Sequence, residues 1–458
     1  MKLSTDSHKN RLSLKGAAVA VLGAARSGIA VSQLLAESGS RVLLSDLKSA
    51  GDLDLDILKF KWLGIEIETG GHSERILESD LICISPGLPL TIPILKRATE
   101  RKIPIVGEIE LSSWFCSDPI YAITGSNGKT TTTALSGDIF RKRDGSTAVA
   151  GNIGLPFAEI VFRKAKHKWV ILEISSFQLE TIVSFHPRIA VIMNLTANHL
   201  DRYPDFDSYA QAKLNILKNM TADDILIYNL DDKYLSEALS DAIPRCLGFS
   251  LSPHSQEGAY WVNNKIVIQL AGRKDCIYLK NLLLRGPHNR FNMMVAALLA
   301  TLDEIPVKII SRQISGFKGI EHRLELVRRI GDVSFFNDSK ATTVDSLIYG
   351  LKSFDDNIIL IAGGKDKGGE FSEANELLKN RVKTVLLLGQ AADRMTVAWQ
   401  EVVPLERMES LQDAVNRAYS MAEPGDTVLL SPACSSFDMF RDYEDRGNQF
   451  KKFVADLK

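Results

Sequence analysis

The run YAITGSNGKTTTT at residues 121–133 has the residue types of a phosphate-binding loop. An apolar, β-prone stretch from Ile120 to Ile123 ends at a Gly-rich turn, and Lys129 with the threonines after it begins a predicted helix. Backbone N–H groups in such a turn and the positive end of a helix dipole both favour an anion. The sequence therefore predicts a site for the phosphates of a nucleotide.

The residue types within this loop predict individual roles. Gly125 and Gly128 allow the backbone to close around phosphate oxygens. Lys129 is placed to reach the β- and γ-phosphates, and Thr130 is placed to bind Mg²⁺. The full phosphate-loop spacing has a glycine where this chain has Ile123, so the loop is a shortened variant. The alternative is a plain Gly-Lys turn between a strand and a helix.

Candidate catalytic residues follow two buried strands predicted beyond the loop. Glu173 follows the strand 169–172, and His199 follows the strand 189–193. A carboxylate at such a strand end can reach the Mg²⁺ of the phosphate loop. Alone, the Glu would be a surface charge and the His a structural residue, but their coincidence with the loop favours a shared site. From pattern alone Lys213, in an Ala/Leu-rich helical run, is a solvated lysine.

Two asparagines stand at the start of an apolar helix predicted over 293–302. Asn289 and Asn292 lie one turn apart on one face of the segment GPHNRFN. They could recognise an adenine edge or cap the helix, and the pattern leaves both possibilities open.

The elements that position these residues begin with a predicted βαβ unit. A strand, a Gly-rich turn and an amphipathic helix occupy residues 17–38, and a second strand over 41–45 ends at Asp46. This order is typical of a nucleotide-binding domain with an acid after its second strand. Ala25 replaces the middle glycine of the dinucleotide fingerprint, so a nucleotide other than NAD fits better. The alternative is a domain of this fold with an empty crevice.

Further strands are predicted to end in polar clusters along the sheet edges where ligands of such folds bind. In the first domain, the strand 81–84 ends in Ser85-Pro86-Gly87. A third segment begins near Ile320, and its strands are predicted at 334–337, 357–362, 385–389 and 427–430. Polar clusters follow three of these strands, which predicts a second doubly wound sheet.

The composition is that of a soluble globular protein of roughly three domains. The 458 residues are 45% hydrophobic and 24% charged, and the net charge of −1 argues against a nucleic-acid or membrane-surface binder. The sequence has no run of 18 apolar residues and no signal-peptide core, and residues 1–14 are predicted to be a loose leader. Five scattered cysteines indicate reduced thiols, and hence a cytoplasmic protein.

Taken together and in order, the motifs resemble those of the Mur ligases of bacterial cell-wall synthesis. The resemblance covers the chain from Ala17 onward, with Lys213 fourteen residues after His199. EISSFQLE, and SPACSSFDMF followed by DYEDRGNQF, resemble specifically the member that adds D-glutamate. The full set is TGSNGKTTT, GNIG, EISSFQLE, NLTANHLDRYP, GPHNRFN, EHR, NDSKATT and SPACSSFD.

The resemblance implies an α/β chain of three domains. Residues 1–107 would be a Rossmann-like domain for the uridine nucleotide. Residues 108–319 would be a central P-loop ATPase-type domain with a mostly parallel sheet. Residues 320–458 would be a Rossmann-like domain that brings the amino acid. It also implies that ATP activates UDP-N-acetylmuramoyl-L-alanine as an acyl phosphate, which D-glutamate then attacks in a step of peptidoglycan synthesis.

Site residues follow from the same resemblance. The catalytic residues would be Lys129, Asn152, Glu173, His199 and Lys213. The ATP site would comprise Gly125, Ser126, Asn127, Gly128, Lys129, Thr130, Thr131, Asn289, Asn292, Arg323 and Asp338. The uridine-nucleotide site would comprise Arg26, Ser27, Gly28, Asp46, Ser85, Pro86 and Gly87. The D-glutamate site would comprise Lys340, Thr342, Lys367, Ser436 and Tyr443. Two Mg²⁺ ions would be held by Thr130, Glu173, His199 and Lys213, the last as a carbamate formed with CO₂.

Several alternatives compete with this interpretation. Another Mur ligase would share most motifs but differ around Glu173. A folylpolyglutamate synthase would share the phosphate loop without the first βαβ domain, and a nicotinamide-dependent dehydrogenase would leave the phosphate loop unexplained. A non-catalytic nucleotide-binding regulator would have lost the catalytic side chains that this chain retains. We expect small-molecule substrates only, with no nucleic acid and no membrane insertion, and a monomer.

Overall fold

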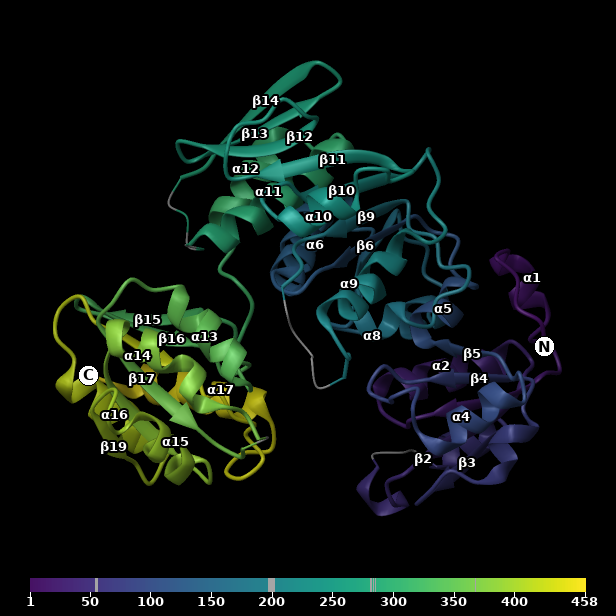
Figure 1. Cartoon of the computed structure of the whole chain (residues 1–458), viewed down its shortest axis with the longest axis horizontal. Coiled ribbons are helices and arrows are strands. Elements are labelled where there is room, and N and C mark those ends of the chain that lie inside the picture. The colour runs from purple at the N-terminus through teal and green to yellow at the C-terminus, as the bar shows by residue number, and fades with distance from the viewer. Residues whose placement is uncertain (54–56, 197–201, 281, 283, 285, 367) are drawn as a thin grey trace. The chain divides into compact units, whose positions relative to one another are not determined.

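The computed structural model (Figure 1) describes the chain except for residues 54–56, 197–201, 281, 283, 285 and 367, and except for the side chains of residues 57 and 345. The described residues form two compact units, Met1–Asn281 with Pro287–Ser315, and Leu282–Gly286 with Gly316–Lys458. Within these described residues there are three sheets, two in the first unit and one in the second. This confirms the predicted three-domain α/β fold, while the domain boundaries at 107/108 and 319/320 stay predictions.

The first sheet is the predicted Rossmann-like one. Its five strands pair in parallel in the order β3-β2-β1-β4-β5, so the chain direction across the sheet reverses between β1 and β4. Helix α2 (Arg26–Glu37) connects β1 to β2, as predicted. The strands are β1 (Ala18–Leu22), β2 (Arg41–Asp46), β3 (Ile65–Thr69), β4 (Leu81–Ile84) and β5 (Ile105–Gly107).

The prediction of a loose leader at residues 1–14 is wrong. Residues Ser7–Leu12 form helix α1, which Asp6 caps by accepting hydrogen bonds from the N–H groups of His8 and Lys9. Leu14 is fully buried and belongs to the core around β1 and α2. The segment is ordered by tertiary burial, which its polar composition did not reveal.

The central sheet has nine strands in the order β14-β13-β12-β11-β10-β9-β6-β8-β7. Neighbouring strands from β7 to β12 pair in parallel, and β13 and β14 add an antiparallel edge. The parallel strands are β6 (Ile120–Thr124), β7 (Thr147–Gly151), β8 (Trp169–Glu173), β9 (Ile189–Ile192), β10 (Ile225–Asn229), β11 (Arg245–Ser250) and β12 (Gly258–Val262). The antiparallel strands are β13 (Lys265–Leu270) and β14 (Arg273–Tyr278).

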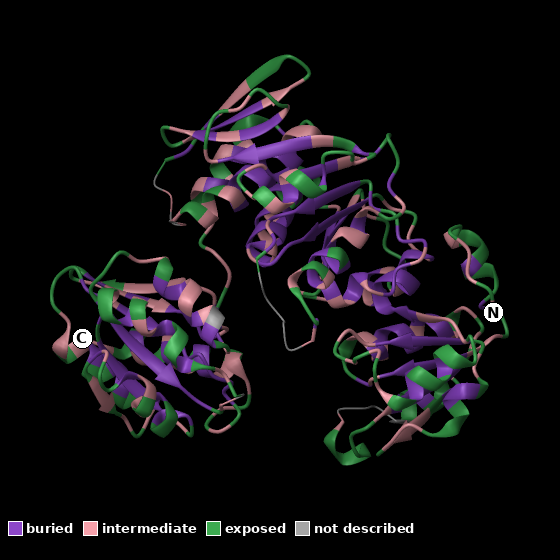
Figure 2. Ribbon diagram, in the orientation of Figure 1, coloured by how far each residue is buried: buried purple, intermediate pink, exposed green. Residues whose placement is uncertain are grey.

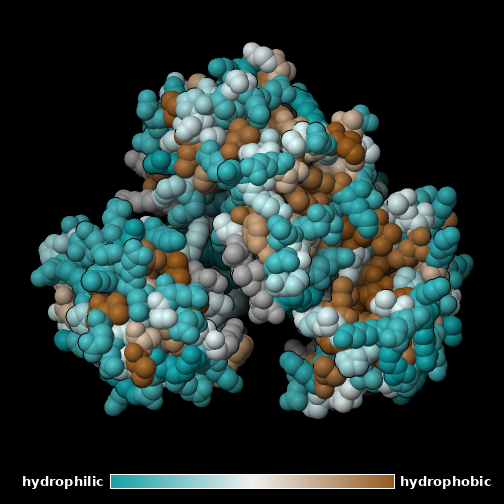
Figure 3. Space-filling view, viewed as in Figure 1, coloured by the Kyte–Doolittle hydropathy of each residue, from teal (hydrophilic) through white to brown (hydrophobic). Residues whose placement is uncertain are grey.

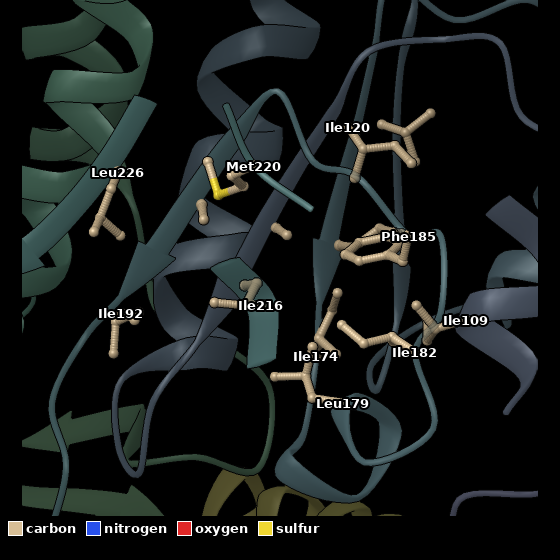
Figure 4. Close-up of a cluster of buried hydrophobic side chains, with 14 of the residues drawn as sticks. Ile109, Ile120, Ile174, Leu179, Ile182, Phe185, Ile192, Ile216, Met220 and Leu226 are labelled. Carbon is tan, nitrogen blue, oxygen red and sulfur yellow. The ribbon is translucent and has the colours of Figure 1, made fainter. Parts of the chain in front are cut away.

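Buried apolar side chains on both sides of this sheet form its core. One cluster joins β6, β8 and β9 to the segment around Leu179–Phe185 and to Ile216, and Figure 4 shows these side chains pointing toward one another. The helices α6 (Lys129–Asp144) and α11 (Pro287–Leu302) pack against each other. The core thereby fixes the carboxyl ends of the strands that carry the candidate site.

The third sheet has six strands in the order β15-β16-β20-β17-β18-β19, with only the edge strand β15 antiparallel. Helix α17 (Tyr443–Asp456) packs against β15 and β16. The strands are β15 (Glu325–Ile330), β16 (Val333–Asn337), β17 (Ile358–Gly363), β18 (Val382–Leu388), β19 (Leu405–Arg407) and β20 (Thr427–Leu430).

Burial follows the layered architecture. In Figure 2 the parallel strands are mostly buried, whereas the outward sides of the helices are exposed. Hydrophilic residues cover most of the face shown in Figure 3, in keeping with 24% charged residues. Within the described part of the chain, no helix combines the length and apolarity needed to cross a membrane.

Candidate active site

The phosphate loop lies between β6 and α6, as predicted. Its two glycines have backbone angles that other residues rarely adopt, with φ of +143° at Gly125 and +82° at Gly128. A Cβ added to Gly128 would lie 2.5 Å from Oδ1 of Asn292, so the helix α11 approaches the loop at this point. The loop therefore needs glycine both for its turn and for close packing.

Residues that follow β9 hold the loop in place. The Ser126 N–H donates to the Asn194 carbonyl at 2.9 Å, and the Asn127 N–H donates to Oδ1 of Asn194 at 2.8 Å. The Ser126 hydroxyl donates to the Thr196 carbonyl, 3.0 Å away, and lies 2.9 Å from the Tyr209 hydroxyl. Residues around the predicted catalytic His199 thus support the loop, while His199 itself lies outside the described residues.

Lys129 and the threonines lie at the start of α6. The Lys129 ammonium donates to the carbonyls of Gly125 at 2.7 Å and Ser126 at 2.9 Å, which places its charge over the loop. Thr130 and Thr131 are buried in the first turn of the helix. The cation and the N–H groups of this helix end converge on one concave backbone segment, which suits a phosphate.

Glu173, the last residue of β8, is 1% exposed. Its Oε1 accepts a hydrogen bond from Nδ2 of Asn152 at 2.9 Å, and the Asn152 N–H donates to its carbonyl at 2.8 Å. Its Oε2 is buried and has no hydrogen-bond partner among the described residues. A buried carboxylate oxygen in this state is costly unless a cation binds it, so this residue fits a metal ligand.

Lys213 is only 2% exposed, in helix α9 (Phe206–Leu214). Its ammonium lies 4.7 Å from the centre of the Tyr209 ring. It makes no ion pair with the residues described. Burial, together with the nearby Lys129 charge, lowers the pKa of Lys213 well below its usual value, although Glu173 acts in the opposite direction. The prediction from pattern alone that Lys213 is a solvated lysine is therefore wrong.

Of the two asparagines of α11, Asn292 contacts the helix that follows the phosphate loop, and Asn289 contacts Asn292. Oδ1 of Asn292 accepts a hydrogen bond from the Thr132 hydroxyl at 3.1 Å, and its Nδ2 donates to Oδ1 of Asn289 at 3.0 Å. Asn292 thus ties α11 to α6, while recognition of adenine by this pair stays a prediction.

The predicted uridine-nucleotide residues gather at the reversal point between β1 and β4, where ligands of this fold bind. Ser85, with Pro86 and Gly87 after it, donates from its hydroxyl to the Gly23 carbonyl at 3.2 Å. Asp46 accepts a hydrogen bond from the Ala24 N–H at 2.6 Å.

Helix α2 begins at this turn with Arg26, Ser27 and Gly28. A Cβ on Gly28 would lie 1.8 Å from the Gly23 carbonyl oxygen, so the turn requires glycine there. Nη2 of Arg26 donates to the Gly154 carbonyl at 2.9 Å, which connects this turn to the loop that carries Asn152.

In the second unit, Asp338 follows β16 and is buried. It accepts hydrogen bonds from the Ser431 hydroxyl at 3.0 Å and from the Leu324 N–H at 3.2 Å. Burial raises the pKa of Asp338 to about 7, and the Arg323 charge opposes this rise. The predicted pair of Arg323 and Asp338 is therefore brought into electrostatic contact.

The predicted amino-acid residues lie at the carboxyl edge of the same sheet. The Lys340 ammonium lies 5.6 Å from the centre of the Tyr443 ring. The Thr342 N–H donates to the Lys340 carbonyl at 2.9 Å, and Ser436 is buried in the loop after β20. Lys367 lies outside the described residues, so its place in this group stays a prediction.

One residue of this edge was missed by the sequence analysis. Arg446, in the first turns of α17, is 2% exposed and donates to residues that follow β16 and β20 and to the last residue of β17. The motif DYEDRGNQF contains Arg446, and a charged residue on an amphipathic helix can face a site. The burial of the Arg446 side chain, however, could not be predicted from this motif, because it depends on the tertiary fold.

Two sizeable cavities lie elsewhere. One of about 670 Å³ lies at the amino ends of β6, β8, β9 and β10, opposite the phosphate loop. Another of about 690 Å³ lies at the carboxyl ends of β18 and β19 and includes Asp438. Neither cavity is lined by the phosphate loop.

Comparison with protein families accounts for nearly the whole chain. The model described as Mur ligase MurD-like, N-terminal domain, matches residues 17–107. The Mur ligase middle domain matches residues 123–300, and the Mur ligase, glutamate ligase domain, matches residues 322–434. A protein of Salinibacter ruber named UDP-N-acetylmuramoylalanine–D-glutamate ligase is 41% identical over 449 residues, covering 95% of this chain and 97% of the relative.

The chain belongs to the Mur ligase family.

Other relatives support this membership. A protein of Acidobacterium capsulatum with the same name is 42% identical over 447 residues, covering 97% of each chain. Among solved structures, a pseudomurein peptide ligase type C from Methanothermus fervidus has a TM-score of 0.60 at 17% identity, covering 97% of this chain and 100% of its own. MurF ligase from Thermotoga maritima in complex with ADP has a TM-score of 0.59 at 15% identity, covering 96% and 95%. At these identities the structures establish the fold.

Membership of the Mur ligase family confirms the family predicted from the motifs, and with it an ATP-dependent ligase. The dehydrogenase and the non-catalytic regulator are thereby set aside. The roles of individual residues remain predictions, although the geometry places most of the described ones at the predicted strand ends.

Proposed function

We propose that this Mur ligase joins D-glutamate to UDP-N-acetylmuramoyl-L-alanine in peptidoglycan synthesis, with ATP converted to ADP and phosphate. The relatives that share this name match along nearly their whole length, at 40–42% identity. The site observation that carries the proposal is the phosphate loop beside a buried Glu173 with an unpartnered oxygen and a buried Lys213. Such a site suits phosphoryl transfer to a carboxylate.

The chemistry requires two steps. The terminal carboxylate of the uridine substrate attacks the γ-phosphorus, so that a carbon-bound oxygen gains the phosphoryl group and ADP leaves. The D-glutamate amine then attacks the acyl carbon, loses a proton, and phosphate leaves. Direct amide formation from a carboxylate and an ammonium would be too slow, which is why the carboxylate must first be activated. The protein contributes mainly positioning and charge neutralisation.

Side chains of the central domain meet these needs. Lys129 would neutralise charge on the β- and γ-phosphates, and the N–H groups of the loop would bind their oxygens. Asn152 fixes one oxygen of Glu173, and the other, which has no hydrogen-bond partner among the described residues, would bind a cation. Asn152 and His199 would hold the acyl-phosphate end. Asn289 and Asn292 would hold the adenine side, and Arg323 and Asp338 would join the ATP site.

Mg²⁺ fits the residues present. Thr130 and Glu173 would hold one ion, and His199 with Lys213 a second. When bound, Mg²⁺ supplies Lewis-acid neutralisation of the phosphates. An ammonium suits this position poorly, because like charges repel. Reaction of the neutral Lys213 amine with CO₂ would form a carbamate anion, and the lowered pKa of Lys213 favours the neutral amine this requires.

The substrate-recognition residues complete the proposal. The turn that carries Arg26, Ser27 and Gly28, together with Asp46 and the segment 85–87, would hold the uridine diphosphate. A dianionic amino acid needs cations and hydroxyls, which are supplied by Lys340, Thr342, Lys367, Ser436 and Tyr443. We further propose a cytoplasmic monomer. None of the five cysteines forms a disulfide, which supports a reducing location.

Product analysis tests this proposal. The full-length protein is incubated with Mg-ATP, UDP-N-acetylmuramoyl-L-alanine and D-glutamate, and the uridine product is identified by mass spectrometry. We expect one added glutamyl residue and stoichiometric ADP. Incorporation of alanine or a diamino acid in its place would assign the chain to another Mur ligase, and glutamylation of a folate would support the folylpolyglutamate alternative.

A further inference from the structure

Arg446 joins three loops of the third sheet through one guanidinium group. Its Nε donates to the Ser339 hydroxyl at 3.0 Å, and its Nη2 donates to the Ser339 carbonyl at 2.9 Å. Nη2 also donates to the Cys434 carbonyl at 3.1 Å, and Nη1 to the Gly363 carbonyl at 3.4 Å. All of these acceptors are uncharged.

The three loops are those that carry the proposed D-glutamate residues. Ser339 immediately precedes Lys340, and Cys434 lies two residues before Ser436. Gly363 begins the segment that leads to Lys367. The Ser339 hydroxyl also donates to the Tyr443 carbonyl at 2.8 Å, which ties the first turn of α17 to the same point. The planar guanidinium of an arginine has five N–H donors in a fixed geometry and can hold several backbone carbonyls in one arrangement. A lysine ammonium lacks this planar geometry.

The charge of Arg446 is held without a close counter-ion. Among the described residues, no carboxylate oxygen lies within 4 Å of the Arg446 guanidinium nitrogens, which is the limit for an ion pair. Asp438 affects the Arg446 charge only at longer range. Burial lowers the pKa of Arg446 to about 10. A buried cation without an ion-pair partner is costly, so an anion brought near it by the substrate would be favoured.

We propose that Arg446 is the positioning residue of the amino-acid site: its buried guanidinium aligns the loops that carry Lys340 and Ser436, and its positive charge attracts the carboxylates of the incoming amino acid through space. The inference deepens the proposed function and rests on it. Arg446 acts through the loops, so it positions the substrate without touching the reacting atoms.

Three substitutions test this role. Arg446→Lys keeps the charge and removes the fork, and Arg446→Gln removes both. Ser339→Ala removes one hydrogen-bond acceptor of Arg446. Because it is a smaller change, it keeps the role testable if the arginine variants do not fold. Arg441→Lys is the matched control, because Arg441 precedes the same helix but its side chain is 88% exposed and pairs with Asp445. Phosphate release is measured while each of the three substrates is varied in turn, and thermal unfolding is recorded for every variant.

We expect the KM for D-glutamate to rise at least about tenfold in both arginine variants, with the larger rise in Arg446→Gln, and about threefold in Ser339→Ala. The KM values for ATP and the uridine substrate should stay within about twofold, as should all values for Arg441→Lys. If folded variants, including Ser339→Ala, keep the wild-type KM for D-glutamate and only their Tm falls, the role is purely structural and the proposal is wrong. Absence of D-glutamate turnover by the wild type would instead contradict the proposed function.

Discussion

At the scale of single residues, Lys213 is the side chain whose environment departs most from its sequence pattern. It is 2% exposed, lies 4.7 Å from the Tyr209 ring centre and shares its surroundings with Lys129 and Glu173. Burial without a counter-ion favours the neutral amine. An amine in that state can react with CO₂, which converts a repelled cation into an anion that a metal can bind.

Substitution of Lys213 tests this interpretation. Lys213→Ala should lower kcat by at least about a hundredfold with the fold intact, because the anion is lost, and acetate should restore part of the activity. Lys213→Arg should stay inactive, since a guanidinium remains charged. The measurement is phosphate release with circular dichroism as the folding control. Near-normal activity of Lys213→Arg would rule out a carbamate.

Local sequence predicts residue roles only where a motif fixes the backbone. The phosphate loop was predictable because Gly125, Gly128 and Lys129 act through a turn and a helix start, which are local features. Lys213 and Arg446 were not assignable from their own patterns, because their burial arises from strands and helices distant in sequence. The resemblance to a family supplied a role for Lys213 and none for Arg446.

At the scale of elements, helix α5 (Glu108–Ser113) fastens the first sheet to the central one. Glu110 is fully buried, and its carboxylate accepts hydrogen bonds from the backbone N–H groups of residues 183, 184 and 185. Glu108 accepts a hydrogen bond from the Ala158 N–H at 2.8 Å, at the start of helix α7 (Phe157–Phe162). These two carboxylates satisfy backbone donors that the helix end and the loop leave unpaired.

Glu108 predicts a pH dependence of stability. Burial raises its pKa from the usual 4.5 to about 7, so the folded state binds this proton more tightly than the unfolded chain. Its contribution to stability is therefore complete below pH 4.5 and is lost as the pH rises through 7. Glu108→Gln keeps an acceptor for Ala158 and does not titrate, so the variant should gain about 3 kcal/mol relative to wild type between these pH values.

Urea unfolding of both proteins between pH 5 and about 8 checks this expectation. Glu100→Gln, which alters an exposed carboxylate of helix α4 (Pro93–Glu100), is the matched control and should show no such trend. A difference between Glu108→Gln and wild type that stays constant with pH would show that Glu108 does not titrate in this range.

Elements were predicted well where period and turn signals agreed. The strands before Glu173, Asp338 and the phosphate loop are buried apolar runs bounded by polar turns, and the structure has strands at each. Helix α1 was missed because its residues are mostly polar and only Asn10 among them is buried. Its order depends on packing against the first sheet, which no local pattern contains.

At the scale of the whole molecule, the proposed ATP residues are divided between the two compact units. The phosphate loop belongs to the first unit, and Arg323 and Asp338 belong to the second. If both sets contact one ATP, catalysis requires the units to close around it. Small-angle scattering should then show a smaller radius of gyration with ATP and the uridine substrate than without them. An identical radius in all liganded states would contradict closure.

The central claim, D-glutamate ligation, is tested most directly by amino-acid selectivity. Phosphate release is followed with Mg-ATP and UDP-N-acetylmuramoyl-L-alanine while D-glutamate, L-glutamate, L-alanine or diaminopimelate is supplied alone. We predict release with D-glutamate and rates near background with the other three, because the residues at the third sheet suit a dianionic amino acid and the motifs EISSFQLE and SPACSSFD resemble those of the D-glutamate-adding member. Robust release with diaminopimelate or L-alanine, and none with D-glutamate, would contradict the account.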